Sequence, residues 1–363
     1  MKLLLRLKLI GLFLFVSNVS AKEIIIEPGP NAYDEVQEAM ILMDEGDTLI
    51  LKSGNYWFED GLSLDVANVT IQGDGMDETI LNFERQVSGA QGLLVTSDSV
   101  TLKDFSILNA KGDALKVIGA NGISMIRLKT EWTGGPKSTN GAYGFYPVES
   151  ENVLIDDCVA IGASDAGIYV GQSKNIIVRN SVAQYNVAGI EIENSYYADV
   201  YNNLASHNTA GILVFDLPDL PQQGGHHIRV FNNKSIDNDT DNFAPEGNIV
   251  GEVPRGSGII VMANSDVEIF KNTLSSLYTF DIVYLVFTLL SLIKCTKHGF
   301  VLSILSASKW LLAYVITLFL FPKAKPYLKD IIDSEYVLDL VVGIGLSLIH
   351  ISEPTRQAEI SYA

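Results

Sequence analysis

Two carboxylates share one short apolar segment of the sequence. Glu191 and Glu193 alternate with Ile190 and Ile192, so they extend from one face of a β-strand whose other face is apolar. Tyr169 stands 22 residues before Glu191. A flat aromatic ring beside carboxylates suits a sugar, because the ring stacks on the sugar's apolar face while the carboxylates accept hydrogen bonds from its hydroxyls. The alternative is that the carboxylates are the solvated face of an ordinary strand and that Tyr169 simply covers the sheet.

Long insertions mark where a site around these residues would be. They occupy residues 130–141, 216–227 and 238–257 and interrupt an otherwise regular repeat, so we expect them to wall both edges of one sheet face. Glu191 and Glu193 are the candidate catalytic residues, and Glu191 would act as a base if the face carries out a reaction. The candidate substrate-binding residues are Lys116, Tyr146, Tyr169, Trp132, Asp216 and His226, and further loop residues that could overhang the face are Lys137, His227 and Arg255. For His226 and His227, which follow two glycines in a Pro-flanked loop, the alternative is an ordinary surface position.

Calcium is the one metal that this set of residues suggests. Asp165, Glu191, Glu193 and Asp216 could supply several oxygen ligands, which Ca²⁺ requires. Their spacing matches no recognised calcium loop, so this assignment is a hypothesis. No glycine-rich phosphate loop opens a helix after a strand anywhere in the chain.

The elements that position these residues are repeats. Ala-Gly-Ile-Tyr-Val at 166–170 recurs as Ala-Gly-Ile-Glu-Ile at 188–192 and Ala-Gly-Ile-Leu-Val at 210–214, which is a period of 22 residues. Each unit holds three period-2 strands separated by Gly, Asn and Asp, which predicts a β-solenoid with three parallel sheets. We expect an inward column of Ile168, Ile190, Ile212 and Ile259 and an outward column of Lys116, Tyr146, Tyr169, Glu191 and Leu213.

Polar residues recur at one turn of this repeat. Left-handed backbone and stacked side-chain amides are expected at Asp157, Asn180, Asn202, Asn232 and Asn272. Before the repeats, the apolar spacing of residues 33–43 predicts an amphipathic helix, and residues 48–51 predict a strand. Together they form a plausible N-terminal cap.

The repeat resembles a known group of proteins. Residues 164–180, Ser-Asp-Ala-Gly-Ile-Tyr-Val-Gly-Gln-Ser-Lys-Asn-Ile-Ile-Val-Arg-Asn, are similar to the right-handed parallel β-helix repeats of the pectate-lyase-like superfamily, and the likeness covers about residues 50–274. The resemblance implies a secreted protein that meets a polysaccharide. It leaves the reaction open, since that superfamily includes polysaccharide lyases, epimerases, glycoside hydrolases and proteins with no known reaction.

Charge and the N-terminal residues agree with an exported protein. Residues 22–274 hold 36 of the 43 acidic residues and only 15 of the 25 basic ones, and a surface this negative repels nucleic acid and anionic lipid. Residues 1–21 carry Lys2, Arg6 and Lys8 before a short apolar run, with Val19 and Ala21 at the positions typical of a cleavage site. We therefore expect a signal peptide over 1–21 and a working place in the bacterial periplasm or on the cell surface.

The last part of the chain has a different character. Residues 282–293 and 300–321 are largely apolar, and the second run is long enough to span a bilayer. Residues 277–345 resemble the start of the CvpA family, the colicin V production proteins of bacterial inner membranes, which implies transmembrane helices and membrane attachment. Residues 346–363 resemble a translated sequencing adapter, which makes an artificial join near residue 275 the expected origin of the fusion.

These observations predict four segments. They are a signal peptide (1–21), a right-handed parallel β-helix (22–274), a truncated CvpA-like transmembrane segment (275–345) and an adapter-derived tail (346–363). The expected function is binding or processing of an extracellular or cell-envelope polysaccharide. Two alternatives stay open: a non-catalytic structural or adhesive surface solenoid, and a CvpA-like inner-membrane protein with a periplasmic solenoid.

Overall fold

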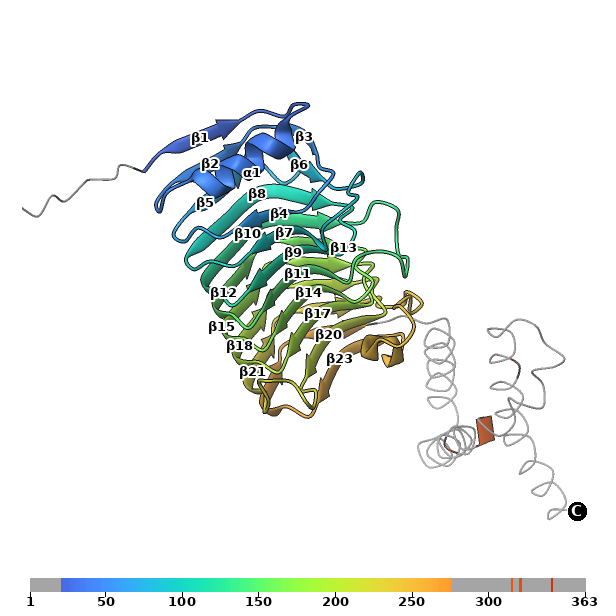
Figure 1. Ribbon diagram of the computed structural model, residues 1–363. Coiled ribbons are helices and arrows are strands. Elements are labelled where there is room, and N and C mark those ends of the chain that lie inside the picture. The colour runs from blue at the N-terminus through green and yellow to red at the C-terminus, as the bar shows by residue number, and fades with distance from the viewer. Residues whose placement is uncertain (1–20, 276–314, 316–319, 322–340, 342–363) are drawn as a thin grey trace, which may run out of the picture. The chain divides into compact units, whose positions relative to one another are not determined.

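The computed structural model describes residues 21–275, 315, 320, 321 and 341 (Figure 1). The chain divides into two compact units, Met1–Ser276 and Leu277–Ala363. The predicted signal peptide, apart from Ala21, lies outside the described residues, as do the adapter-like tail and nearly all of the CvpA-like segment. Among the described residues, no helix combines the length and the apolar character needed to cross a membrane.

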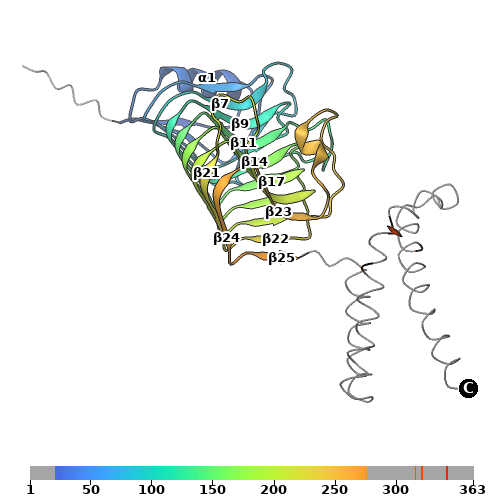
Figure 2. The ribbon, with the colours of Figure 1, turned by 90° about the horizontal axis from the view of Figure 1, so that it is seen from below.

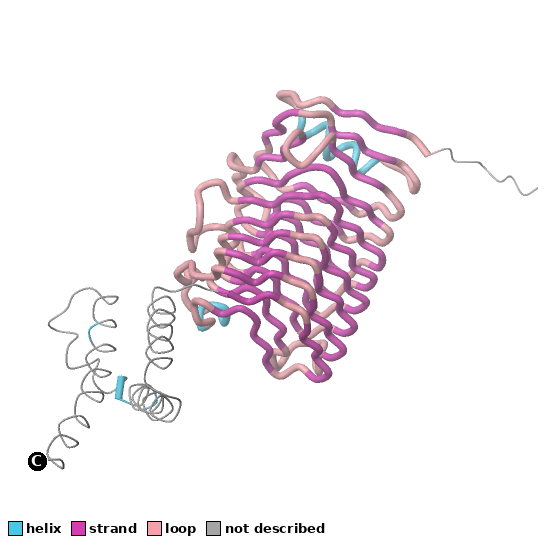
Figure 3. Tube along the Cα trace, turned by 180° about the vertical axis from the view of Figure 1, so that it is seen from behind, coloured by secondary structure: helices cyan, strands magenta, loops and turns pink. Residues whose placement is uncertain are grey.

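The first unit is mainly β, and its strands run parallel in stacked coils (Figure 3). Three strands make one coil, and the chain then returns to the next position of each stack. One stack is an eight-stranded sheet that contains β4 (Leu62–Leu64), β7 (Gln91–Val95), β9 (Asp113–Ile118), β11 (Tyr143–Val148), β14 (Ala166–Gly171), β17 (Ala188–Glu193), β20 (Ala210–Phe215) and β23 (Ser257–Met262).

The other two stacks are joined in one 17-stranded sheet. The first stack contains β1 (Glu23–Ile26), β2 (Thr48–Leu51), β5 (Thr70–Gly73), β8 (Val100–Leu108), β10 (Asn121–Glu131), β12 (Glu151–Asp156), β15 (Lys174–Arg179), β18 (Tyr196–Tyr201), β21 (His226–Phe231) and β24 (Ser265–Phe270). The second stack contains β3 (Gly54–Trp57), β6 (Thr79–Asn82), β13 (Val159–Ile161), β16 (Val182–Gln184), β19 (Leu204–Ser206), β22 (Lys234–Ile236) and β25 (Thr273–Ser275).

The expectation of three separate sheets was therefore wrong in one respect. Strands β8 and β10 are long enough to pair with both stacks: β8 pairs with β5 and β6, and β10 pairs with β12 and β13. Because these two strands continue through the corner between the stacks, hydrogen bonding connects the stacks into a single sheet.

The predicted strand register is confirmed. Ile168 pairs with Ile190, Ile190 with Ile212 and Ile212 with Ile259, and the first three of these side chains are fully buried in the core. On the outer face, Tyr146 follows Lys116, and Tyr169, Glu191 and Leu213 follow one another in the same column. The 22-residue period thus places each side chain on the face that the repeat predicts.

Asparagine ladders run along the inside of the stack, one residue later than expected. The left-handed turn residues are Asp157, Asn180, Asn202, Asn232 and Lys271, so Asn272 does not occupy that turn. The stacked amides belong instead to the following residues: the Asn203 backbone N–H donates to Asn233 Oδ1 at 3.0 Å, and that of Asn233 donates to Asn272 Oδ1 at 2.9 Å. The turn residue supplies the backbone conformation, while its neighbour supplies the buried hydrogen bonds.

A second ladder explains the glycine of the Ala-Gly-Ile repeat. The Asn186 N–H donates to Asn208 Oδ1 at 3.0 Å, and the Asn208 N–H donates to Asn238 Oδ1 at 3.2 Å. A Cβ at Gly167 would lie 2.6 Å from the Asn186 side-chain nitrogen, and one at Gly189 would lie 2.9 Å from that of Asn208. A side chain at either glycine would displace the ladder, so glycine is required by close approach.

The two ends of the described solenoid differ. Helix α1 (Ala32–Leu42) packs Val36 and Met40 into the core at the N-terminal end, close to the expected range of 33–43, and β2 has the predicted bounds. At the other end, β23, β24 and β25 form the last described coil (Figure 2). Their residues Val261, Ile269 and Leu274 are 39%, 47% and 53% exposed.

Candidate functional site

The outer face of the eight-stranded sheet carries the predicted site residues, but it is not an open surface. All residues of β14, β17 and β20 are buried. Tyr169 and Glu191 are each only 4% exposed, and Leu213 is fully buried. The interpretation of Glu191 and Glu193 as a solvated strand face was therefore wrong.

The third insertion covers part of this face. It contains the short 3-10 helix η1 (Ile249–Glu252), and its buried residues Val250 and Val253 form one apolar cluster with Tyr169 and Leu213. The Asn242 side-chain amide donates to the carbonyls of Val250, Gly251 and Val253, which holds the insertion in a compact turn. The apolar residues of this insertion follow no sequence repeat, so the sequence did not indicate which surface they contact.

Tyr169 and Glu193 form one unit on this face. The Tyr169 hydroxyl donates to Glu193 Oε1 at 2.7 Å. The ring reaches Glu193 by lying over Gly171, the register partner of Glu193, where a Cβ would come within 2.1 Å of the hydroxyl oxygen. Gly171 is therefore a requirement for this hydrogen bond, which favours the ionised form of the Glu193 carboxyl.

Glu191 is in a different environment. Its Oε2 atom is buried and has no hydrogen-bond partner among the described residues. Burial, together with the nearby carboxylates of Asp165 and Glu193, holds the pKa of Glu191 well above its ordinary value. Burial also raises the pKa of Glu193, but the Tyr169 hydroxyl opposes that rise.

Two further carboxyls belong to the same electrostatic group. Burial raises the pKa of Asp165 to about 7, opposed by a hydrogen bond with Tyr143, and raises the pKa of Asp113 to about 6, opposed by Lys116. Sequence reasoning placed Asp165 only in the calcium set and missed Asp113 and Tyr143. The Asp-Ala pairs at 113–114 and 165–166, which begin the same segment of two coils, were an available signal.

Two tyrosines, Tyr143 and Tyr146, and Lys116 form the more accessible part of the site, next to the buried Tyr169. The ring centroids of Tyr143 and Tyr146 are 4.3 Å apart, and those of Tyr143 and Tyr169 are 4.7 Å apart. Lys116 Nζ lies 4.6 Å from the centroid of the Tyr146 ring and 4.0 Å from Asp113 Oδ2. Tyr143, Tyr146 and Lys116 are half-buried, so part of their surface reaches solvent beside the buried carboxyls.

The loop residues are distributed differently from the prediction. Trp132 is buried in the core and its indole N–H donates to Ala110 O at 2.7 Å, so it does not overhang the face. His226 lies in β21, in the other sheet, and stacks on Tyr196 at 4.5 Å between ring centroids. Asp216 is at the site: its carboxylate contributes to the raised pKa of Glu193, and its Oδ2 accepts a hydrogen bond from the Gly224 N–H.

The remaining overhanging residues are exposed loop positions. Lys137 and His227 are exposed, and Arg255 pairs with Asp241 on its own insertion. Within the described ranges, no three His, Cys, Asp or Glu side chains converge as metal ligands. The structure therefore does not support the calcium set of Asp165, Glu191, Glu193 and Asp216.

The class of this part of the chain, a parallel β-solenoid, agrees with the comparisons. Residues 91–303, more than half of the chain, match the family model described as the right handed beta helix region, so the chain belongs to that family. Residues 280–351 match the model of the colicin V production protein, in agreement with the resemblance of the C-terminal segment. No curated protein matches the sequence.

Several solved structures are similar to this chain. The PL6 family alginate lyase AlyGC is similar at 12% identity and a TM-score of 0.40, covering 70% of this chain and 40% of that one, so the match spans less than half of the lyase. Pectate lyase Pel9A is similar at 13% identity and a TM-score of 0.41, and the match covers 71% of this chain and 80% of the lyase. The tailspike protein of E. coli bacteriophage HK620, in complex with a pentasaccharide, is similar at 13% identity and a TM-score of 0.45. The match covers 68% of this chain and 54% of the tailspike protein.

Proposed function

We propose that the chain is an exported protein that hydrolyses an uncharged extracellular polysaccharide at the outer face of the eight-stranded sheet. The observation that carries this proposal is the Glu191 carboxyl, which is buried, has an unpaired oxygen and has a raised pKa. A raised pKa favours the protonated form of the carboxyl, which can donate its proton to a glycosidic oxygen. It is the residue that we assign as the general acid.

Glu193 is the complementary group. Glycoside hydrolysis requires two carboxyls, one that donates a proton and one that is ionised. The Tyr169 hydroxyl bonded to Glu193 favours the carboxylate there, whereas Glu191 has no such donor among the described residues. Two neighbouring carboxyls whose environments push their pKa values apart are the pattern expected for acid and base roles.

The charge of the site selects the substrate. Asp113, Asp165 and Asp216 accompany the two glutamates, and Lys116 is the cation that lies beside them. A polyuronate would be repelled by the ionised members of this set, Glu193 among them. Half-buried Tyr143 and Tyr146 offer aromatic surface on which an uncharged sugar ring can stack.

Glu191→Gln tests the proposal. Reducing ends released from xylan, β-glucan, mannan and starch are measured for the wild type and the variant, with polygalacturonate as the anionic control. We expect release from an uncharged polysaccharide and a loss of turnover of about a hundredfold or more in Glu191→Gln. Calorimetric binding should change little, because glutamine keeps the shape of the side chain. The matched control, Asp219→Asn on the exposed loop, should behave as the wild type.

The covering insertion favours a second candidate, a glycan-binding solenoid without turnover. Val250 and Val253 form one apolar cluster with Tyr169 and Leu213, the register partners of Glu191, and Glu191 itself is only 4% exposed. In that case polysaccharide binding is measurable, no reducing ends appear, and Glu191→Gln leaves binding unchanged. Release of anionic products only, or no binding to any polysaccharide, contradicts both candidates.

Export and membrane attachment belong to the same proposal. We assign residues 1–21 to export, which places the solenoid in the periplasm or on the cell surface, and residues 277–345 to attachment at the inner membrane if that segment is native to the protein. N-terminal sequencing of the exported protein should begin at Lys22.

A further inference from the structure

A concave site lies at the N-terminal end of the solenoid. It has a volume of about 810 Å³ and lies between the segment before α1, strand β3 and the loop that precedes β7. Its chemically distinctive lining consists of Tyr33, Asp34, Trp57, Glu59, Asp60 and Arg85. None of these residues belongs to the set of acidic side chains around Glu191.

Trp57 presents an aromatic surface at this pocket. Its side chain is 38% exposed, and the Arg85 guanidinium lies 4.4 Å from the ring centroid. Within the described part of the chain, Arg85 makes no ion pair, so the stacking contact holds it in place while its N–H donors remain available to a ligand. An oriented guanidinium next to an exposed indole is a site for a flat, polar ligand.

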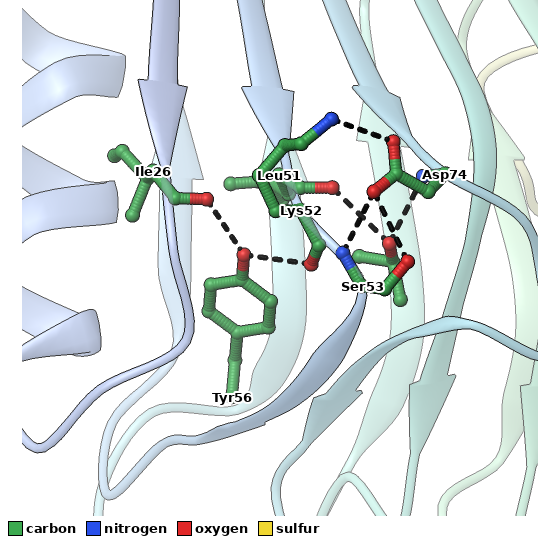
Figure 4. A network of polar contacts seen from close by, with 7 residues as sticks. Ile26, Leu51, Lys52, Ser53, Tyr56 and Asp74 are labelled. Atoms are coloured by element: carbon green, nitrogen blue, oxygen red, sulfur yellow. Dashed lines mark hydrogen bonds and ion pairs between the residues drawn. The ribbon is translucent and has the colours of Figure 1, made fainter.

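The pocket is held rigidly from beneath. Tyr56, next to Trp57, points inward, and its hydroxyl lies 2.8 Å from Ile26 O and 2.9 Å from Lys52 O, as Figure 4 shows. The Tyr33 ring packs edge-on against Phe58 at 6.2 Å, and the Val87 N–H donates to Glu59 O at 2.8 Å. The strand and both loops are therefore fixed to the core, and a ligand would bind without ordering them.

Charge decides the class of ligand. Asp34, Glu59 and Asp60 supply three carboxylates against the one guanidinium of Arg85, which disfavours an anionic ligand. An uncharged sugar is bound by groups of these kinds. Carboxylates accept hydrogen bonds from the sugar hydroxyls, a guanidinium donates hydrogen bonds to those hydroxyls, and an aromatic face stacks on the sugar ring. We propose that this pocket is a distal subsite for an uncharged sugar residue of the polysaccharide.

The position of the pocket gives it a role in the proposed function, on which this inference rests. The loops that contain Asp60 and Arg85 lead from the second stack to the eight-stranded sheet, and the covering insertion makes the same connection. They therefore lie at one edge of that sheet. Strand β4 is five strands from β17, which is on the order of 24 Å at the usual strand spacing. A long polysaccharide could occupy both places, whereas a short one could not.

Tryptophan fluorescence tests the subsite directly. Trp57 is exposed, Trp132 is buried in the core, and the third tryptophan is Trp310. The experiment uses the full chain carrying Glu191→Gln, so that ligands stay intact, and titrates it with xylohexaose, cellohexaose, mannohexaose and maltohexaose. At least one should change the emission, and Trp57→Phe should abolish that change. Trigalacturonate should produce no change.

Affinity measurements separate this inference from the proposed function. Trp57→Ala and Arg85→Ala should each weaken calorimetric binding of the responding hexasaccharide about tenfold or more, whereas Tyr197→Ala, which removes an exposed aromatic of β18 outside this pocket, should not. If no uncharged hexasaccharide changes the Trp57 emission, the subsite is refuted even where Glu191-dependent hydrolysis occurs. If the emission changes and Glu191→Gln hydrolyses as the wild type does, the subsite stands and the assignment of Glu191 fails.

Discussion

The environments of Glu191 and Glu193 differ although the two residues are neighbours on one strand face. Glu193 receives the Tyr169 hydroxyl because Gly171 leaves room for the ring, while Glu191 receives no donor from the described residues. A buried carboxyl without a donor is costly when it is ionised, so it takes up a proton instead. A buried carboxyl whose pKa is raised by its surroundings is typical of functional sites.

Stability should depend on pH through the same residues. The pKa of Asp165 is about 7 in the folded chain against an ordinary value of 3.8, so the folded state binds more protons than the unfolded state between these values. The free energy of unfolding should therefore fall as the pH rises from about 4 to about 7. Asp165→Asn should remove about 1 to 3 kcal/mol of that fall.

Denaturant titrations at several pH values provide the measurement. Carboxyls whose pKa is lowered by partners, such as Asp156 beside Arg179, lose their contribution only as the pH falls below their ordinary value, so they do not obscure this range. Asp219→Asn, on an exposed loop, serves as the control and should keep the wild-type slope. A slope that is the same in Asp165→Asn as in the wild type would contradict the electrostatic coupling described for this face.

At the scale of the element, the strand β17 has two faces with opposite requirements. Ile190 lies between Ile168 and Ile212 in the core, and an aspartate there has no partner. Ile190→Asp should lower the free energy of unfolding by several kcal/mol, whereas Glu191→Gln at the next position should be nearly neutral or stabilising at pH 7. Thermal unfolding followed by circular dichroism measures both. Equal melting temperatures would show that the faces are assigned incorrectly.

The repeat made the strands and their two faces predictable, but it did not predict which loops cover them. Period and alternation were enough to place Ile190 inside and Glu191 outside, because parallel strands in register preserve both. The path of the covering insertion could not be predicted, since Val250 and Val253 belong to no repeat and their contact with Leu213 is set by tertiary packing. Trp132 was misplaced for the same reason: its indole turns back to Ala110 O in the core.

At the scale of the whole molecule, the last described coil leaves inward-facing residues in contact with solvent. Val261, Ile269 and Leu274 continue the columns of the core but are substantially exposed. A fragment of residues 22–275 should therefore associate through this end, because an unpaired parallel strand and apolar side chains are presented together. Light scattering should show concentration-dependent association, and Ile269→Lys should reduce it. A monodisperse fragment at all concentrations would contradict this expectation.

The regular stacking of coils also fixes the distance between the Trp57 pocket and Glu191. Every coil adds one strand spacing, so the separation between the Trp57 pocket and Glu191 can change only by whole coils. Insertion or removal of one 22-residue unit would keep each inward and outward column intact while lengthening or shortening the span by about 4.8 Å. If one polysaccharide binds at both places, the number of repeats between them sets the shortest ligand that reaches both, independently of the side chains at either end.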